Sequence, residues 1–112
     1  MIREIEFHKH YFLEFYSKQT LKVQEKFEYV FKLIQQVDFI PEKFFKHLSS
    51  TSGLYEIRVE YQSNIYRVFC FFDKGKLIVL LNGFQKKTQK TPRKEIKMAE
   101  QLKKEYFNEK EN

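Results

Sequence analysis

Among its 112 residues the sequence contains one cysteine, which could cross-link the chain, and only two prolines and three glycines, which interrupt secondary structure. It contains no tryptophan. A single cysteine excludes an intramolecular disulfide and provides no zinc-binding pattern. Cys70 lies in an apolar run, which predicts a buried thiol in a reducing compartment. No stretch of about 18 apolar residues is present, and the N-terminal segment is charged where a signal peptide would be apolar. We therefore expect a cytoplasmic protein that does not enter a membrane.

Apolar and aromatic residues, in contrast, are plentiful. The chain is 42% hydrophobic and 18% aromatic, with 13 phenylalanines and 7 tyrosines, although 32% of its residues are charged. This composition is typical of a folded chain and not of a disordered one. A chain of this length can form one compact core, so we predict a single domain over residues 1–112.

The charge is unevenly distributed along the chain. The formal net charge is +6, and residues 86–112 carry nine Lys or Arg against five Asp or Glu, whereas residues 1–48 are nearly balanced. A basic run is often no more than a solvated face. Concentrated at one end, however, it favours a polyanionic partner such as nucleic acid over a neutral substrate.

Hydrophobic periodicity predicts a mixed α+β fold. Alternation favours a short edge strand over residues 2–7, and helical spacing favours helices over 9–16 and 18–37, the second capped by Ser17. A connecting segment around Pro41 and residues 50–53 follows. Three strands are then expected over 54–60, 65–72 and 76–84, joined by short turns into an antiparallel meander. Thr91 as cap and Pro92 as first helical residue predict a last helix that ends near Tyr106.

Two arginines in this meander point to a site. A hairpin turn within residues 61–64 places Arg58 directly opposite Arg67, and like charges that face each other across strands are destabilising. An anionic ligand between them would explain the pair. Glu56, diagonal to Arg67, would neutralise it instead, and a one-residue slip in register would put the arginines on opposite faces.

More positive charge follows the third strand. The segment after Phe84 contains Lys86, Lys87 and Lys90, so arginines and lysines are expected to converge at one end of the sheet with an aromatic ring nearby. Such a set suits RNA, because guanidinium clamps phosphate and an aromatic ring stacks on an unpaired base. The residues expected to contact RNA around the arginines are Glu56, Asn82, Phe84, Lys90 and Thr91.

The same cluster contains the groups needed for RNA cleavage without a metal. This reaction needs a base for the 2′-hydroxyl, an acid for the leaving 5′-oxygen and positive charge on the transition state. Like-charge repulsion lowers the pKa of a lysine, which makes Lys86 or Lys87 the candidate acid or base beside Arg58 and Arg67. No metal-ligand cluster or cofactor motif is found. His8 and His10 are expected at the surface, and His47 is a weak catalytic candidate.

The motifs LYEIRV, NIYRVFCFF and IVLLNGFQKKTQKTP resemble those of the phage-derived Gp49-like, HigB-type branch of the RelE/ParE toxin superfamily. The resemblance extends from about Tyr11 to Leu102. It implies a RelE-like fold, with helices on one face of a small antiparallel sheet and an open basic face opposite. The strand arginines of the family correspond to Arg58 and Arg67, and its closing basic segment corresponds to residues 84–92. The tyrosine that other branches place near the cleaved phosphate is missing, unless Tyr106 replaces it.

The resemblance also implies a function. Toxins of this family are typically ribosome-dependent mRNA endonucleases that act in the ribosomal A site and are silenced by a HigA-type helix-turn-helix antitoxin. Two alternatives remain open at this point. One is a ParE-like toxin that inhibits DNA gyrase without nuclease chemistry, and the other is an inactive phage-derived remnant that only binds its antitoxin.

Overall fold

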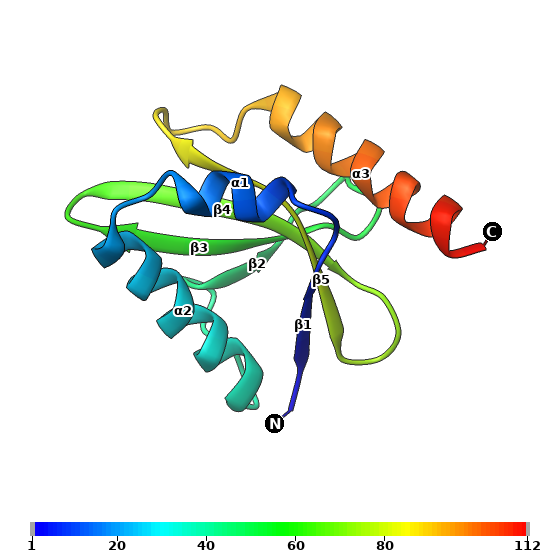
Figure 1. Cartoon of the computed structure of the whole chain (residues 1–112), viewed down its shortest axis with the longest axis horizontal. Coiled ribbons are helices and arrows are strands. Elements are labelled where there is room, and N and C mark those ends of the chain that lie inside the picture. The colour runs from blue at the N-terminus through cyan, green and yellow to red at the C-terminus, as the bar shows by residue number, and fades with distance from the viewer. Residues whose placement is uncertain (1, 112) are drawn as a thin grey trace.

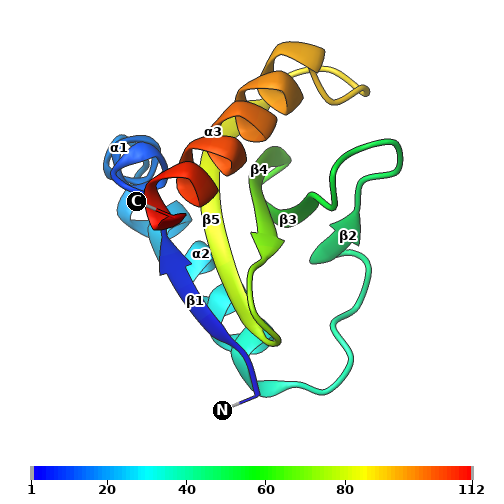
Figure 2. The same cartoon turned by 90° about the vertical axis from the view of Figure 1, so that its right-hand side faces the viewer.

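The computed structural model describes residues 2–111 and has a central sheet with helices on both faces (Figures 1 and 2). Its strands lie in the order β1-β5-β4-β3-β2, which Figure 2 shows from one side of the sheet to the other. The elements in chain order are β1 (Glu4–Phe7), α1 (Tyr11–Ser17), α2 (Leu21–Gln36), β2 (Phe45–His47), β3 (Tyr55–Tyr61), β4 (Asn64–Phe72), β5 (Leu77–Lys86) and α3 (Arg93–Glu111).

The meander β3-β4-β5 forms the middle of the sheet, as predicted. Strands β3 and β4 are antiparallel, and Arg58 is the register partner of Arg67. Gln62 and Ser63 connect them with positive φ angles of 47° and 69°. Positive φ at both central residues is the geometry of a two-residue turn whose twist matches that of the strands. This turn fixes the register and thereby places the two arginines opposite each other.

The outer strands differ from the prediction. β1 lies at an edge, as expected, but it pairs with β5 in parallel, from Glu4 opposite Leu77 to Phe7 opposite Leu80. The sheet is therefore mixed and not purely antiparallel. β2 lies within the expected connecting segment and pairs with β3 at the other edge. With three residues it is too short for an alternating pattern to be visible in the sequence.

The helix starts also differ. α2 begins after Thr20, whose hydroxyl accepts the Val23 amide proton at 3.3 Å, and not after Ser17, which donates to the Glu14 carbonyl. α3 begins at Arg93, because the Ile96 amide bonds to the carbonyl of Pro92, so Pro92 and not Thr91 occupies the cap position. The helix extends beyond the predicted end at Tyr106 to Glu111.

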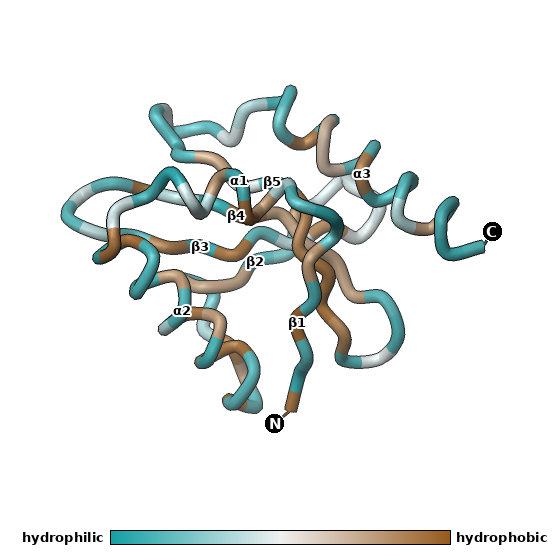
Figure 3. The backbone as a smooth tube through the Cα atoms, in the orientation of Figure 1, coloured by the Kyte–Doolittle hydropathy of each residue, from teal (hydrophilic) through white to brown (hydrophobic). Residues whose placement is uncertain are grey.

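Two hydrophobic cores lie on the two faces of the sheet. On one face, α1 and α2 bury Phe12, Phe27 and Ile34 against residues such as Ile57. On the other, α3 buries Ala99 and Leu102 against a second set that comprises Leu54, Phe69, Phe71, Val79, Leu81 and Phe84. The resemblance implied an open face opposite the helices, and α3 occupies part of that face. The hydrophobic runs of β4 and β5 agree with this, since strands covered on both sides lack polar alternation; Figure 3 shows these strands as the hydrophobic centre.

An irregularity in the β4–β5 pairing separates the two ends of the sheet. Val68 faces Gly83, but Cys70 faces Leu80, so β5 has one residue more than β4 between these pairs. The sequence suggested Gly75 as the place for such a bulge, whereas Gly75 lies in the turn before β5 with φ 56°. The extra residue puts both Leu81 and Asn82 on the α3 side, because Leu81 packs in the α3 core and Asn82 bonds to Glu95.

A candidate RNA-binding site at the hairpin end

The side chain of Glu56 lies between the two facing arginines. Its Oε1 atom is 2.9 Å from Nε of Arg58 and 3.4 Å from Nε of Arg67, and the carboxylate is only 2% exposed. The alternative that Glu56 neutralises the pair is therefore the arrangement found. One carboxylate serves two guanidinium groups, so the cluster keeps a net positive charge.

Arg67 is the more deeply placed arginine, at 5% exposure on a central strand. Its Nη1 donates to the Tyr66 carbonyl at 3.1 Å, while its Nε has no hydrogen-bond partner among the described residues despite the nearby carboxylate. Burial lowers the pKa of Arg67, the Glu56 charge opposes this shift, and the Arg58 charge adds to it. A buried guanidinium that is incompletely hydrogen-bonded has donor capacity left for an anion.

Both arginines line an open depression of about 620 Å³ at the end of the β3–β4 hairpin, where the chain leaves β5. Figure 1 shows the hairpin turn and the segment after β5 at the same end of the molecule, and Figure 3 shows that this segment is hydrophilic. Lys86 and Lys87 line the same depression, so all four predicted catalytic residues lie together. The complete lining is Arg58, Ser63, Asn64, Ile65, Arg67, Lys86, Lys87, Thr88 and Gln89.

Lys86 has an environment different from that of the other lysines at this end. It ends β5 opposite Ile65 and is partly buried. Burial is the main cause that lowers its pKa, and the positive charge of Arg67 adds to the effect. A lysine with a lowered pKa exists more often as the neutral amine at neutral pH, which is the form that accepts a proton.

None of the five residues predicted to contact RNA lines this depression, although Glu56 lies behind it between the two arginines. Phe84 is 8% exposed and packs on Phe69 with ring centroids 5.3 Å apart, so it presents no open face to a base. Asn82 is buried and donates to the backbone and side chain of Glu95 in α3. Both side chains are turned away from the depression because α3 covers this part of the sheet, and their contact with RNA stays a prediction. Lys90 is exposed on the connecting loop, and the Thr91 hydroxyl donates to Glu56 at 3.5 Å.

The structure adds polar residues that the sequence analysis did not assign to the site, chiefly Asn64 and Gln89. Asn64 accepts a hydrogen bond from Gln85 at 3.3 Å, which joins the hairpin turn to the end of β5. A signal for Asn64 was present in the sequence: once a two-residue turn pairs Arg58 with Arg67, the turn itself must lie beside them. Gln89 lies in the irregular loop between β5 and α3, whose conformation no periodic pattern in the sequence predicts.

The other titratable candidates lie elsewhere. His8 was expected at the surface but is 5% exposed, because α3 folds over it and its Nε2 lies 2.7 Å from Oε1 of Glu105. His47, the last residue of β2, packs against the ring of Tyr55 on β3. Tyr106 donates to Asp73 at 2.7 Å, and burial together with this bond raises its pKa to about 12. It lines a different depression with His8 and Lys9, so it does not replace the missing tyrosine.

Burial also makes Cys70 an unreactive thiol, because desolvation raises its pKa. Among residues 2–111, no group of three or more His, Cys, Asp or Glu side chains is arranged to hold a metal ion. In the same part of the chain, no helix combines the length and apolar character needed to cross a membrane.

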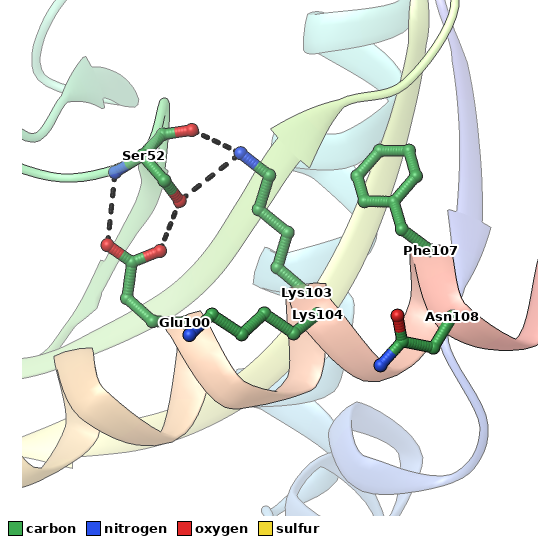
Figure 4. A pocket seen from close by; sticks show the side chains of 6 residues that line it. All are labelled: Ser52, Glu100, Lys103, Lys104, Phe107 and Asn108. Atoms are coloured by element: carbon green, nitrogen blue, oxygen red, sulfur yellow. Dashed lines mark hydrogen bonds between the residues drawn. The ribbon is translucent and has the colours of Figure 1, made fainter.

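A second depression, of about 460 Å³, lies between the loop before β3 and α3 (Figure 4). Glu100 accepts hydrogen bonds from the amide and the hydroxyl of Ser52, and Lys103 donates to the carbonyl and the hydroxyl of the same residue. These charged side chains are therefore used to fasten the loop to the helix. The depression at the hairpin end, whose lysines form no ion pair within residues 2–111, is the better candidate site.

Comparisons with known proteins agree with this picture. The family model described as phage derived protein Gp49-like matches residues 12–104. No curated protein matches the sequence significantly. Among solved structures, a chain of the archaeal RelE-RelB complex from Pyrococcus horikoshii OT3 is similar in fold, with a TM-score of 0.55 and 21% identity over 74% of this chain and 93% of that chain. The chain thus belongs to the phage-derived Gp49-like family and has the RelE-like α+β fold that its motifs predicted.

Proposed function

We propose that this protein is the toxin of a type II toxin–antitoxin pair and that it cleaves mRNA on the ribosome. The observation that carries the proposal is the depression at the hairpin end, where Arg58 and Arg67, which share the Glu56 carboxylate, lie together with Lys86 and Lys87. Four cationic side chains in one open depression suit a phosphodiester, and a fold shared with a chain of a RelE-RelB complex makes a toxin role the leading candidate.

The chemistry requires proton transfer and charge stabilisation. The 2′-oxygen attacks phosphorus after losing its proton to a base, and the bond to the 5′-oxygen breaks as that oxygen receives a proton from an acid. Lys86, with its lowered pKa, is suited to be the base, and Lys87 is the candidate acid. Arg58 and Arg67 would stabilise the charge that develops on the phosphoryl oxygens. In this scheme the proton transfers and the charge stabilisation are carried out by the four side chains alone.

The test is primer extension on an mRNA in a translating extract, with and without ribosomes. Arg67→Ala and Lys86→Ala are expected to lower cleavage by about 10²-fold or more, the size of effect seen when a transition-state donor or a general base is lost. Lys22→Ala removes the same charge from an exposed position on α2 and is expected to cleave like the wild type. Far-UV circular dichroism and thermal melts show whether each variant is folded.

Two results would contradict the proposal. If a folded Arg67→Ala variant cuts mRNA as fast as the wild type, the site is wrong. If wild-type protein stops growth while mRNA stays intact and a DNA-damage response appears, the ParE-like alternative replaces the nuclease. An adjacent reading frame for a small helix-turn-helix protein would support the proposed HigA-type antitoxin partner.

A further inference from the structure

A smaller depression of about 240 Å³ adjoins the candidate site. It is lined by Lys26, Lys43, Phe44, Arg58 and Glu60, so Arg58 is a wall of both depressions. Lys26 comes from α2, Lys43 and Phe44 from the segment before β2, and the other two from β3. A ligand that reaches Arg58 from the hairpin end can therefore continue along β3 into this smaller depression.

The two lysines there are free to meet an anion. Within residues 2–111 neither ammonium group forms an ion pair, whereas Lys46, close by in the sequence, pairs with Glu42. Lys26 Nζ lies 5.1 Å from the ring centroid of Tyr29, and Lys43 Nζ lies 4.9 Å from that of Phe44. Such contacts restrain the side chains without neutralising them, because the ring carries no net charge.

The depression is also held in place by the site that it adjoins. The Arg58 amide donates to the Phe44 carbonyl at 2.8 Å, and its Nη1 lies 3.5 Å from the Glu42 carbonyl. The segment that carries Lys43 is thus bonded to the arginine of the first depression. Glu60 is the only carboxylate among the lining residues. Because Arg58 already pairs with Glu56, the excess of positive charge comes from the two lysines.

We propose that this smaller depression is an extension subsite for single-stranded RNA, in which Lys26 and Lys43 contact backbone phosphates next to the one held at Arg67. The inference rests on the proposed function, since it names where the RNA continues beyond the cleaved position. An RNA strand is favoured over a single small anion, because the two cationic depressions share one wall and successive phosphates of one strand can occupy both.

Binding of 2′-O-methyl RNA, which cannot be cleaved at the modified positions, tests the inference by fluorescence anisotropy at several salt concentrations. The probes are a trinucleotide and a dodecanucleotide. The double variant Lys26→Ala/Lys43→Ala should bind the trinucleotide as the wild type does and the dodecanucleotide more weakly. Its slope of log Kobs against log salt for the dodecanucleotide should be smaller by about 1.4, since each phosphate contact on a single strand contributes about 0.7.

The matched control is Lys18→Ala/Lys22→Ala, which removes the same charge from exposed positions outside both depressions and should change neither affinity. Equal binding of the dodecanucleotide by wild type and the Lys26/Lys43 variant overturns the inference. So does a variant that keeps its RNA affinity but loses affinity for a polyglutamate peptide, since the subsite would then take an acidic protein. Either result is distinct from failure of the proposed function, which is read from cleavage by Arg67→Ala.

Discussion

At the scale of single residues, Glu56 decides how the arginine pair is understood. The like-charge pair looked like a place for an external anion, and the structure shows that an internal carboxylate already occupies part of that role. The remaining positive charge comes from the second guanidinium together with Lys86 and Lys87. The site is therefore a partly compensated cluster and not a bare pair of charges.

Replacing this carboxylate separates its two roles. Glu56→Gln should lower the free energy of unfolding by about 1–3 kcal/mol, because Arg58 loses its charged acceptor and Arg67 loses the negative charge beside it. The same variant should bind phosphate or RNA more tightly, since the net charge of the depression rises. Urea titrations with and without added phosphate measure both effects, and phosphate should restore part of the lost stability.

Glu60→Gln is the control for this change, because it removes an exposed carboxylate from the same strand. It should leave the free energy of unfolding within about 0.5 kcal/mol of the wild type, as surface substitutions usually do. A Glu56→Gln variant that is as stable as the wild type and gains nothing from phosphate would show that the carboxylate does not bridge the arginines.

Much of the site could be predicted from the sequence, for reasons visible at individual residues. Arg58 and Arg67 are related by a two-residue turn, so simple pairing arithmetic placed them opposite each other. The burial of Phe84 could not be predicted, because it depends on α3, whose packing on β5 does not show in the sequence pattern. His8 was assigned wrongly for the same reason, since its partner Glu105 is 97 residues away.

At the scale of elements, α3 is the part that the sequence described least well. It is joined to the rest of the molecule at three places along its length: Glu95 to Asn82, Glu100 and Lys103 to Ser52 (Figure 4), and its C-terminal turns to His8 and Asp73. Beyond Tyr106 the helix is held by ion pairs of Glu109 with Lys9 and of Lys110 with Asp73. Because each of them joins distant parts of the chain, local periodicity gives no sign of them.

The Asp73 contact gives this anchoring a pH dependence. Hydrogen bonds from Lys110 and Tyr106 lower the pKa of Asp73, so its stabilising effect is present above the unfolded-state pKa of about 4 and is lost as pH falls through the folded-state value. Asp73→Asn should therefore destabilise the protein at pH 7 by roughly 1 kcal/mol, with a difference that shrinks towards pH 2. Denaturant titrations across this pH range provide the measurement.

Asp38→Asn is a suitable comparison, because the Asp38 carbonyl and not its carboxylate accepts the Arg3 hydrogen bond. Its effect on stability should be small at every pH. A pH-independent loss in Asp73→Asn would mean that the charge of the carboxylate contributes nothing to holding α3.

The contact between α1 and β5 depends on Gly83. A Cβ atom at this position would lie 2.6 Å from Cδ2 of Phe15, closer than side chains tolerate. Gly83→Ala should thus cost about 1–3 kcal/mol through overpacking. Thermal or urea unfolding measures this loss. In a Phe15→Leu background the same substitution should cost clearly less, and an equal cost in both backgrounds would rule out the steric explanation.

At the scale of the whole molecule, the sheet separates two cores that share no side chains. Ile34 belongs to the core under α2 and Leu102 to the core under α3. Ile34→Val should cost about 0.5–1.5 kcal/mol and Leu102→Ala about 2–5 kcal/mol. Because the positions lie on opposite faces, the double variant should lose the sum of these values within about 0.5 kcal/mol.

Urea unfolding followed by both near-UV and far-UV circular dichroism tests this additivity and the cooperativity of the fold. The two signals should give the same midpoint in every variant, as expected for a small cooperative unit. Separate midpoints in Leu102→Ala alone would show that the α3 core unfolds by itself.

The parallel pairing of β1 with β5 has a consequence for synthesis of the protein. Glu4 meets Leu77, so the first strand finds its neighbour only after the β3–β4 hairpin and the start of β5 have been translated. Such long-range contacts form late, because the entropic cost of closing a large loop comes before the contacts can stabilise the chain. A nascent chain can hold the β3–β4 hairpin while its sheet is still incomplete. The arginine pair, which this hairpin brings together, can therefore form before β1 has joined the sheet.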